Sequence, residues 1–371
     1  MRFEFATAAR IVFGAGTVRE VPAASAAMGK RALLVTRRTA DLEHIGIAGE
    51  PFAVHGEPTV DLVRQGTQLA RDSGCDHIVA IGGGSAIDAG KAIAAMLGNG
   101  GDPLDYLEVI GHGRQLTRPS VPCIAVPTTA GTGSEVTRNA VLASPAHRVK
   151  ASLRSPHMLP SLAVVDPELA LDLPPNVTAF TGLDALTQLI EPYVSCRANR
   201  MTDLYCVEGL RLAATALRRA WQDGRDLAAR TDMAYAALLG GLALANAGLG
   251  AVHGFASPIG GMFDAPHGAI CAALLPHAMR VNIAALPRAA LDRYAAIARI
   301  LTGHDDAAPE DGAGWVEALC RDLEIQPLGA YGIREADVPE LAAKAATASS
   351  MKANPIVLTP HQLEDLLTSA I

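Results

Sequence analysis

The segment DHIVAIGGGSAIDAGKA (residues 76–92) decides the fold of the first half of the chain. A compact run of Ile, Val and Ala leads into Gly82, Gly83, Gly84 and Ser85, and a helical pattern follows to about residue 97. Glycines at a strand-to-helix turn let backbone N–H groups approach a pyrophosphate, and the following helix presents its positive end. The spacing is not G-x-G-x-x-G, and a plain tight turn uses the same residues. GGGS alone therefore leaves phosphate binding and a structural turn both open.

Similar strand-like runs lie on either side of this segment. They are RALLVT (31–36), PFAVHG (51–56), PCIAVPTT (122–129) and SLAVVDPEL (161–169), and helical patterns cover about 59–73 and 85–97. Continuous Val- and Ile-rich runs are typical of parallel strands that are covered on both faces. Alternating strands and helices imply right-handed crossovers in an open sheet. We therefore expect an α/β domain with a parallel sheet over residues 1–175.

The composition and periodicity of the sequence change after LPPN (173–176). From Val177 onward the chain is rich in Ala and Leu with helical periodicity, so we expect an all-helical domain over residues 176–371. Two domains also suit a chain of 371 residues. The stretch from Met233 to Val252 resembles a membrane span, with Asn246 as its one amide side chain. Its Ala and Gly content and the prolines that follow favour a buried core helix.

Composition excludes several classes of function. The chain has 31 basic and 38 acidic residues and only 4% aromatic residues, so neither charge nor stacking favours nucleic-acid binding. The six cysteines form no C-x-x-C pair, and a chain of this size needs no disulfide staples. The first ten residues lack the apolar stretch of a secretory signal. We expect reduced thiols in a cytoplasmic protein that has no membrane partner.

A second glycine- and hydroxyl-rich loop, PTTAGTGSE (127–135), also follows a predicted strand. Such a loop can simply cap a helix. Two loops of this kind at the carboxyl ends of parallel strands, where open α/β sheets bind ligands, strengthen the case for a nucleotide.

A possible metal site lies in the second half of the chain. Asp184 and Gln188 are spaced i and i+4, so they share one helical face. His253 and His267 lie in VHGFASPIGGMFDAPHG, where Pro258 and Pro266 should interrupt the helix and leave both imidazoles at helix termini or in loops. One carboxylate, one amide and two imidazoles suit Fe²⁺, Zn²⁺ or Mn²⁺. Spacing alone leaves open that each is a separately satisfied buried polar group.

Four motifs in this order carry a resemblance to a known family. IGGGSAIDAGKA, VPTTAGTGSE, GLDALTQLIEPYVS and VHGFASPIGGMFDAPHGAICAALLPHAM strongly resemble the iron-containing alcohol dehydrogenases over about residues 10–290. The start RIVFGAGTV is also similar to the maleylacetate reductase branch of that superfamily. The resemblance implies a dehydroquinate synthase-like fold with a Rossmann-like dinucleotide-binding α/β domain and an all-α metal-binding domain. It further implies hydride transfer in the cleft between them and a homodimer or larger homo-oligomer.

The resemblance also assigns roles to residues of this chain. Gly82, Gly83, Gly84 and Ser85 would hold the pyrophosphate, and Asp88 would lie near the nicotinamide. The other implied cofactor contacts are Thr128, Thr129, Thr132 and Lys150, although a solvated surface charge is the alternative for Lys150. Asp184, His253 and His267 match metal ligands of the family, so they would carry catalysis through the metal.

The chain departs from the family pattern at several positions. Gln188 stands where relatives usually have histidine, and its weaker amide oxygen should change metal affinity or preference. Ser257 replaces a histidine that relatives use in proton transfer. Arg37, in VTRR, lies near the usual position of an aspartate that binds the ribose 2′-hydroxyl, and a guanidinium there suits the 2′-phosphate of NADP(H). His277 falls in a family-like LPH motif, where we expect a buried structural histidine.

The sequence therefore predicts a metal-dependent alcohol dehydrogenase or aldehyde reductase that uses NAD or NADP and one Fe²⁺ or Zn²⁺ ion, with a small alcohol or aldehyde as substrate. A metal-independent reductase of the maleylacetate type is the nearest alternative. A sugar-phosphate cyclase would need a phosphate-binding cluster of Lys, Arg and Asn near the ligand motifs, which we do not find. A non-catalytic paralogue that binds a dinucleotide is the remaining class.

Overall fold

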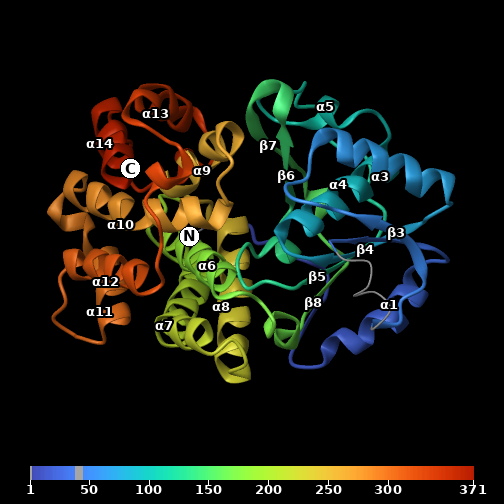
Figure 1. Ribbon diagram of the computed structural model, residues 1–371, viewed down its shortest axis with the longest axis horizontal. Coiled ribbons are helices and arrows are strands. Elements are labelled where there is room, and N and C mark those ends of the chain that lie inside the picture. Colours follow the sequence, from blue (N-terminus) through green and yellow to red (C-terminus); the bar gives the residue numbers. More distant parts are fainter. Residues whose placement is uncertain (1, 38–44) are drawn as a thin grey trace. The chain divides into compact units, whose positions relative to one another are not determined.

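The computed structural model describes residues 2–37 and 45–371, and its chain divides into two compact units (Figure 1). The α/β unit comprises Phe5–Thr129 and Gly133–Ala170. The helical unit comprises residues 2–4, Ala130–Thr132 and Leu171–Ile371. Arg38, the last residue of the VTRR run, lies outside the described residues.

The α/β unit contains a six-stranded, fully parallel sheet in the order β1-β8-β5-β4-β2-β3. Its strands are β1 (Ile11–Phe13), β2 (Ala32–Thr36), β3 (Gly49–Ala53), β4 (His77–Gly82), β5 (Cys123–Pro127) and β8 (Leu162–Val165). The parallel sheet and five of these strands confirm the prediction. Strands β2, β4, β5 and β8 are shorter than the predicted runs, and β3 begins two residues before its run. The edge strand β1 was not predicted.

Both faces of the sheet are buried. Alternate residues of β2 and β4 belong to two separate hydrophobic cores. Leu33 and Ile78 lie in one core, and Leu34 and Val79 lie in the other. The unit's helices are α1 (Val21–Met28), α3 (Val60–Asp72), α4 (Gly84–Asn99) and the single turn α5 (Pro103–Tyr106). Helices α3 and α4 cover the first core, and Val21 of α1 belongs to the second. Each buried aliphatic side chain contributes about 1.5–3 kcal/mol, which is why central strands carry continuous apolar runs.

The strand order reverses between β2 and β4. The chain runs from β2 outward to β3 and then crosses back to place β4 on the other side of β2, with Thr36 in register with Ile81. The loops that follow β2 and β4 therefore leave the sheet side by side. A reversal of this kind is where open α/β sheets bind ligands.

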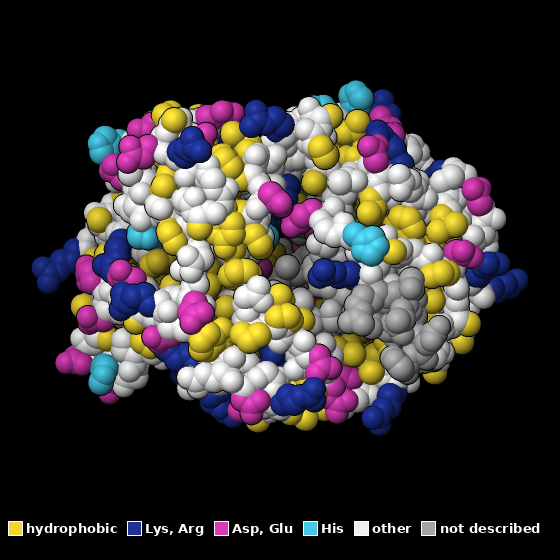
Figure 2. All heavy atoms as spheres, viewed as in Figure 1, with side chains coloured by type: hydrophobic (Ala, Val, Ile, Leu, Met, Phe, Trp, Pro, Cys, Tyr) yellow, Lys and Arg dark blue, Asp and Glu magenta, His cyan; other side chains and the backbone are white. Residues whose placement is uncertain are grey.

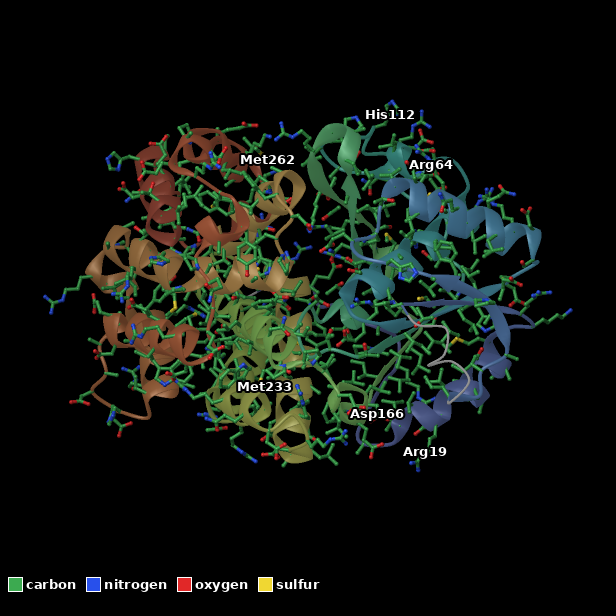
Figure 3. The ribbon with its side chains drawn as sticks, in the orientation of Figure 1. Arg19, Arg64, His112, Asp166, Met233 and Met262 are labelled. Atoms are coloured by element: carbon green, nitrogen blue, oxygen red, sulfur yellow. The ribbon has the colours of Figure 1, made fainter. Side chains whose placement is uncertain are left out.

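Two further features complete the α/β unit. An antiparallel hairpin of β6 (Asn139–Ser144) and β7 (Val149–Arg154), which the sequence did not reveal, pairs outside the main sheet. Asp166 directly follows β8 (Figure 3). Its carboxylate accepts hydrogen bonds from the amides of Gly16 (3.1 Å) and Val18 (3.0 Å), which ties the turn after β1 to the sheet.

The helical unit contains nine α-helices in its described residues. They are α6 (Pro175–Val194), α7 (Arg200–Gln222), α8 (Leu227–Ala247), α9 (Ala251–Met262), α10 (His267–Ala285), α11 (Asp292–Thr302), α12 (Pro309–Asp322), α13 (Val338–Thr347) and α14 (Pro360–Ala370). Helix α6 packs against α7, α8 and α10 and is buried along most of its length (Figure 1). A side chain on α6 is therefore held on several sides.

The predicted core helix over Met233–Val252 is two helices. Helix α8 ends at Ala247 and α9 begins at Ala251, with a bend of 97° between them. Gly248 has φ of 77°, a conformation that ends a helix and favours glycine. Helix α10 has the length and hydropathy of a membrane span, but 67% of that window is buried inside the unit, as in a core helix.

The surface and the thiols agree with the composition. On the described part of the face in Figure 2, basic and acidic side chains are interspersed, with no broad basic field. All six cysteines are free.

Candidate metal centre and cofactor loops

Helix α6 brings two polar side chains into the core of the helical unit. Asp184 and Gln188 lie one turn apart, and each is only 2% exposed. Oδ1 of Asp184 and Oε1 of Gln188 have no hydrogen-bond partner among the described residues. Buried acceptors without a donor are costly, so such atoms point to a missing cation or ordered water.

His253 occupies the first turn of α9, and the start of that helix is held by side chains from elsewhere. The amide of Ala251 donates to Oδ1 of Asn354 (3.1 Å), and the amide of Val252 donates to Oε1 of Glu191 (2.7 Å). At Gly250 a Cβ would lie 2.9 Å from the Asn354 oxygen and 3.0 Å from the Glu191 oxygen, so the approach requires glycine. The position of His253 is thereby fixed relative to α6, which carries Glu191.

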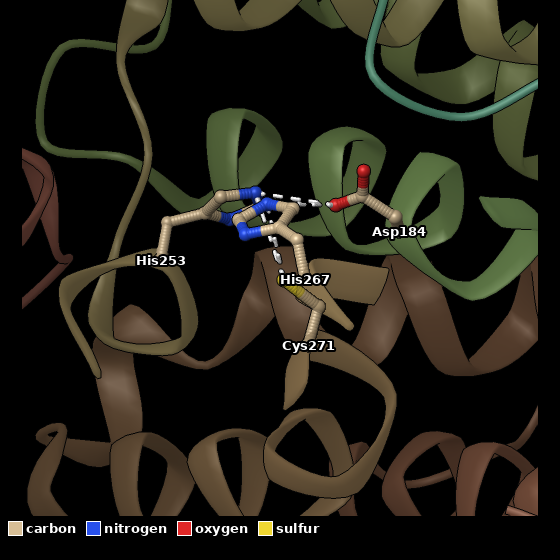
Figure 4. Close-up of side chains that lie close together, drawn as sticks. All are labelled: Asp184, His253, His267 and Cys271. Atoms are coloured by element: carbon tan, nitrogen blue, oxygen red, sulfur yellow. Dashed lines mark hydrogen bonds and ion pairs between the residues drawn. The ribbon is translucent and has the colours of Figure 1, made fainter. Parts of the chain in front are cut away.

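The second oxygen of Glu191 sets the tautomer of His253. Its Oε2 lies 2.7 Å from Nδ1 of His253. A carboxylate only accepts, so Nδ1 carries the hydrogen. Nε2 of the same ring lies 3.3 Å from Oδ1 of Asp184 (Figure 4). Glu191 was not singled out in the sequence.

His267 is the first residue of α10, and its Nε2 lies 3.8 Å from Oδ1 of Asp184. The helix starts close to α6, because a Cβ on Gly268 would lie only 2.4 Å from the carbonyl oxygen of Phe180. Both histidines thus lie at helix N-termini, as predicted. The expected break at Pro258 is wrong, because this proline lies inside α9.

Cys271 joins the same group, although sequence reasoning did not include it. It lies one turn after His267 on α10 and is fully buried. Its Sγ is 3.6 Å from Nε2 of His267 and 3.9 Å from Nε2 of His253. One ligand atom from each of Asp184, His253, His267 and Cys271 lies within 4.8 Å of the others (Figure 4). The His-x-x-x-Cys spacing was the available signal.

The electrostatics of this group favour positive charge. Burial opposes ionisation of all three titrating groups here, but it is outweighed by neighbours. Cys271, Glu191 and Asp184 raise the pKa of His253 well above its usual value, and Cys271 and Asp184 raise the pKa of His267 to about 9. The two imidazoles in turn hold the pKa of Asp184 below its usual value. Either bound protons or a divalent cation can compensate the negative charge of these side chains.

In the α/β unit, the two predicted loops lie together. Gly82 is in register with Pro127, the amide of Thr128 donates to the carbonyl of Gly82 (2.9 Å), and a Cβ on Gly83 would lie 3.5 Å from Thr129. Gly82 has φ of 155°, and a Cβ there would lie 2.7 Å from that of Ala86. Helix α4 starts at Gly84 without a side-chain cap. Its N-terminus and the glycines form the kind of backbone surface that binds phosphate.

The other predicted cofactor residues lie in different parts of the structure. Arg37 is exposed and directly follows β2, beside the loop after β4. Asp88 accepts from the Val141 amide (2.8 Å) and the Ser134 hydroxyl, and it pairs with Lys91 (3.1 Å), so its carboxylate anchors the hairpin. Thr132 belongs to the helical unit.

The alternative interpretation of Lys150, a solvated surface charge, is wrong. Its side chain is 6% exposed and pairs with Glu57 at 3.0 Å. Ser257 lies one turn after His253 on α9 and is half-buried. His277, on α10, is also half-buried, and burial lowers its pKa.

Family models cover almost the whole chain. The model for iron-containing alcohol dehydrogenase matches residues 8–167, and that for the C-terminal part of the Fe-containing alcohol dehydrogenase family matches residues 178–371. The chain belongs to the iron-containing alcohol dehydrogenase family. It is 40% identical to the 1,3-propanediol dehydrogenase of Citrobacter freundii over 347 residues, 88% of each chain. It is 33% identical to the NAD-dependent methanol dehydrogenase of Bacillus methanolicus, with 97% of each chain covered.

The fold agrees with this membership. A crystal structure of a 1,3-propanediol oxidoreductase superposes with a TM-score of 0.92 at 36% identity, covering 100% of both chains. This iron-containing alcohol dehydrogenase is therefore an oxidoreductase that acts on CH–OH groups of small alcohols, or on the corresponding aldehydes, with NAD(P) and a divalent metal. The comparisons do not favour the maleylacetate-type alternative.

Proposed function

We propose that this dehydrogenase interconverts primary alcohols and aldehydes, with Asp184, His253 and His267 holding the divalent metal. The observation that carries the proposal is the group in which Nε2 of both imidazoles lies within 3.8 Å of Oδ1 of Asp184, with His253 buried and the side chain of His267 33% exposed. The similarity to dehydrogenases of 1,3-propanediol and of methanol supports primary alcohols as the substrate class.

The donor set fits a divalent metal. It combines an anionic oxygen with two imidazoles whose Nε2 atoms face it, and Oδ1 of Asp184 lacks a hydrogen bond that would compete. We assign Gln188 as a weaker, neutral oxygen donor to the same metal, because its Oε1 is buried without a hydrogen-bond partner among the described residues. When bound, the metal supplies Lewis acidity to the substrate oxygen, and the nicotinamide supplies or accepts the hydride.

The residues around the ligands hold them in place. Glu191 keeps a hydrogen of His253 on Nδ1, so that Nε2 is the ring nitrogen that can bind the metal. The tight contact of Gly268 with the backbone of α6 keeps His267 near Asp184. These contacts fix the positions of both imidazoles relative to Asp184.

We further propose that the α/β unit is the dinucleotide-binding domain and the helical unit the metal- and substrate-binding domain. In this assignment the glycine loop receives the pyrophosphate, and Arg37 receives a 2′-phosphate. The remaining proposed cofactor contacts are Gly82, Gly83, Gly84, Ser85, Asp88, Thr128, Thr129, Thr132 and Lys150. A cytoplasmic location and a homodimer or larger homo-oligomer complete the proposal.

The test begins with metal content per chain, measured by inductively coupled plasma mass spectrometry on protein purified anaerobically without chelator or affinity metal. A panel of primary alcohols and aldehydes is then assayed with each nicotinamide cofactor, before and after chelation. About one Fe or Zn per chain and chelator-sensitive turnover of primary alcohols are expected. Turnover that survives complete metal removal would overturn the metal assignment and favour the alternative, a metal-independent reductase.

The variant Asp184→Asn supplies a second check. It keeps the shape of the side chain but removes the anionic charge, so metal content should fall with activity. The matched control Asp232→Asn changes a partly buried aspartate of α8 that is not part of the metal-capable group. Its metal content should stay at the parental value.

A further inference from the structure

We propose that Sγ of Cys271 is a direct ligand of the metal. The inference rests on the proposed function, because it assumes that Asp184, His253 and His267 hold the same ion. It adds an anionic sulfur donor to an oxygen and nitrogen set.

The distances within the group carry the proposal. A tetrahedral metal with bonds of about 2.0–2.1 Å to nitrogen and oxygen and about 2.3 Å to sulfur separates its N and O ligands by about 3.3–3.4 Å and its N and S ligands by about 3.6 Å. The N···O separations from Asp184 are 3.3 and 3.8 Å, and the N···S separations from Cys271 are 3.6 and 3.9 Å. These four separations are within about 0.5 Å of those values, and one ligand atom from each of the four residues lies within 4.8 Å of the others, as a shared metal requires.

The surroundings of Cys271 differ from those of the other thiols in the unit. Sγ of Cys320 donates to the carbonyl of Ala272 (3.5 Å), and Sγ of Cys196 donates to the carbonyl of Lys352 (3.7 Å). Sγ of Cys271 instead hydrogen-bonds to imidazole nitrogens, the same Nε2 atoms that face Asp184 (Figure 4). The i and i+4 spacing from His267 places both donors on one face of α10.

Charge and softness favour Cys271 over Gln188 as the fourth strong donor. A thiolate and the Asp184 carboxylate together neutralise a divalent ion, which matters where both anionic side chains are buried, whereas an amide leaves one positive charge uncompensated. Thiolate ligands favour zinc, while oxygen-rich sites suit harder ions such as Mn²⁺. Gln188 then remains a weak and exchangeable donor beside the tetrahedron.

The experiment uses the full chain, stripped of metal by a chelator and titrated with Co²⁺ as an optical substitute for zinc. A thiolate ligand produces a sulfur-to-metal charge-transfer band in the near ultraviolet, separate from the visible ligand-field bands that any bound Co²⁺ gives. We expect the band in the parent protein and in Cys206→Ala, which removes an equally buried thiol from α7. In Cys271→Ser and Cys271→Ala the band should vanish, and Zn²⁺ affinity should fall by more than about 100-fold, the upper range for removing an outer-shell partner.

Each outcome has a defined meaning. Visible bands without the charge-transfer band in the parent protein would overturn the Cys271 assignment and leave the proposed function intact. A chain that takes up no Co²⁺ would overturn both. Loss of the band in Cys206→Ala would show that the band does not report Cys271. Should the Cys271 variants fail to fold, X-ray absorption on the zinc-loaded parent protein decides, because a sulfur at about 2.3 Å is required.

Discussion

Glu191 and His253 are joined by a 2.7 Å contact between Oε2 and Nδ1, and the other oxygen of Glu191 accepts from the amide of Val252 at 2.7 Å. One carboxylate on α6 therefore orients the imidazole and also holds the helix that carries it. A partner of this kind fixes the ring and raises its basicity as a ligand.

Replacing this carboxylate by Glu191→Gln should weaken metal binding by about 10- to 100-fold. An amide has one acceptor oxygen, whereas the structure uses both oxygens of Glu191, so either His253 or Val252 loses its acceptor. Competitive titration with a chromophoric chelator measures the change. The control Glu208→Gln alters an exposed glutamate of α7 and should leave the affinity unchanged. Equal affinities for both variants would mean that Glu191 does not orient the ligand.

Gly268→Ala should destabilise the protein, although alanine usually improves a helix. The added Cβ would lie 2.4 Å from the carbonyl oxygen of Phe180, so α10 must move away from α6. Overpacking of this kind costs about 1–3 kcal/mol. Thermal unfolding measures the effect, and metal affinity should fall as well because His267 moves with the helix.

Gly314→Ala is the matched control for that substitution. Gly314 lies in α12, and no atom lies within 4 Å of the position that a Cβ would take there, so the ordinary preference for alanine should apply. We expect a gain of about 0.5–1 kcal/mol. Loss of stability in both variants would mean that the contact with Phe180 is not the cause.

Glu135 should make the stability of the α/β unit depend on pH. Burial raises the pKa of this carboxyl to about 7, although Lys91 opposes the shift. The folded state therefore binds the proton more tightly than the unfolded state, whose glutamate titrates near 4.5. Stability falls as pH rises from about 4.5 to 7 and then levels off.

The variant Glu135→Gln removes this ionisation without changing the shape of the side chain. The free energy of unfolding of this variant should equal that of the parent protein near pH 4 and exceed it above pH 7 by no more than about 3 kcal/mol. Urea denaturation followed by far-ultraviolet circular dichroism at several pH values measures the difference. A constant difference across the pH range would contradict the assignment to Glu135.

The fold was predictable where burial leaves a continuous local pattern. Strands β2, β4 and β5 are covered on both faces, so their residues are uniformly apolar. The three-residue strand β1 exists because β8 pairs with it, more than 150 positions away in the chain. The break between α8 and α9 depends on one glycine conformation within an apolar run. Neither feature leaves a periodic signal.

The candidate site was predictable in part. The spacing of Asp184 and Gln188 places both side chains on one face of α6, and Pro266 directly precedes α10, which begins at His267. Pro258 lies inside α9 and does not mark the start of the helix that carries His253. Bringing α6, α9 and α10 to one point is tertiary packing, and the roles of Glu191 and Asn354 follow only from that packing. Cys271 did carry a local signal, one turn after His267, but a single cysteine on an apolar face is most often an ordinary core residue.

Arg37→Ser should shift the cofactor preference away from NADPH. Arg37 is exposed at the end of β2, where the strand order reverses beside the glycine loop after β4. A charge-assisted contact with the 2′-phosphate contributes about 1.5–3 kcal/mol, so KM for NADPH should rise about 10- to 100-fold while that for NADH changes little. Arg31→Ser, at the other end of the same strand, should alter neither value. Steady-state kinetics with both cofactors measure these KM values. An equal rise in KM for NADH and NADPH would mean that Arg37 contacts a group common to both cofactors and not the 2′-phosphate.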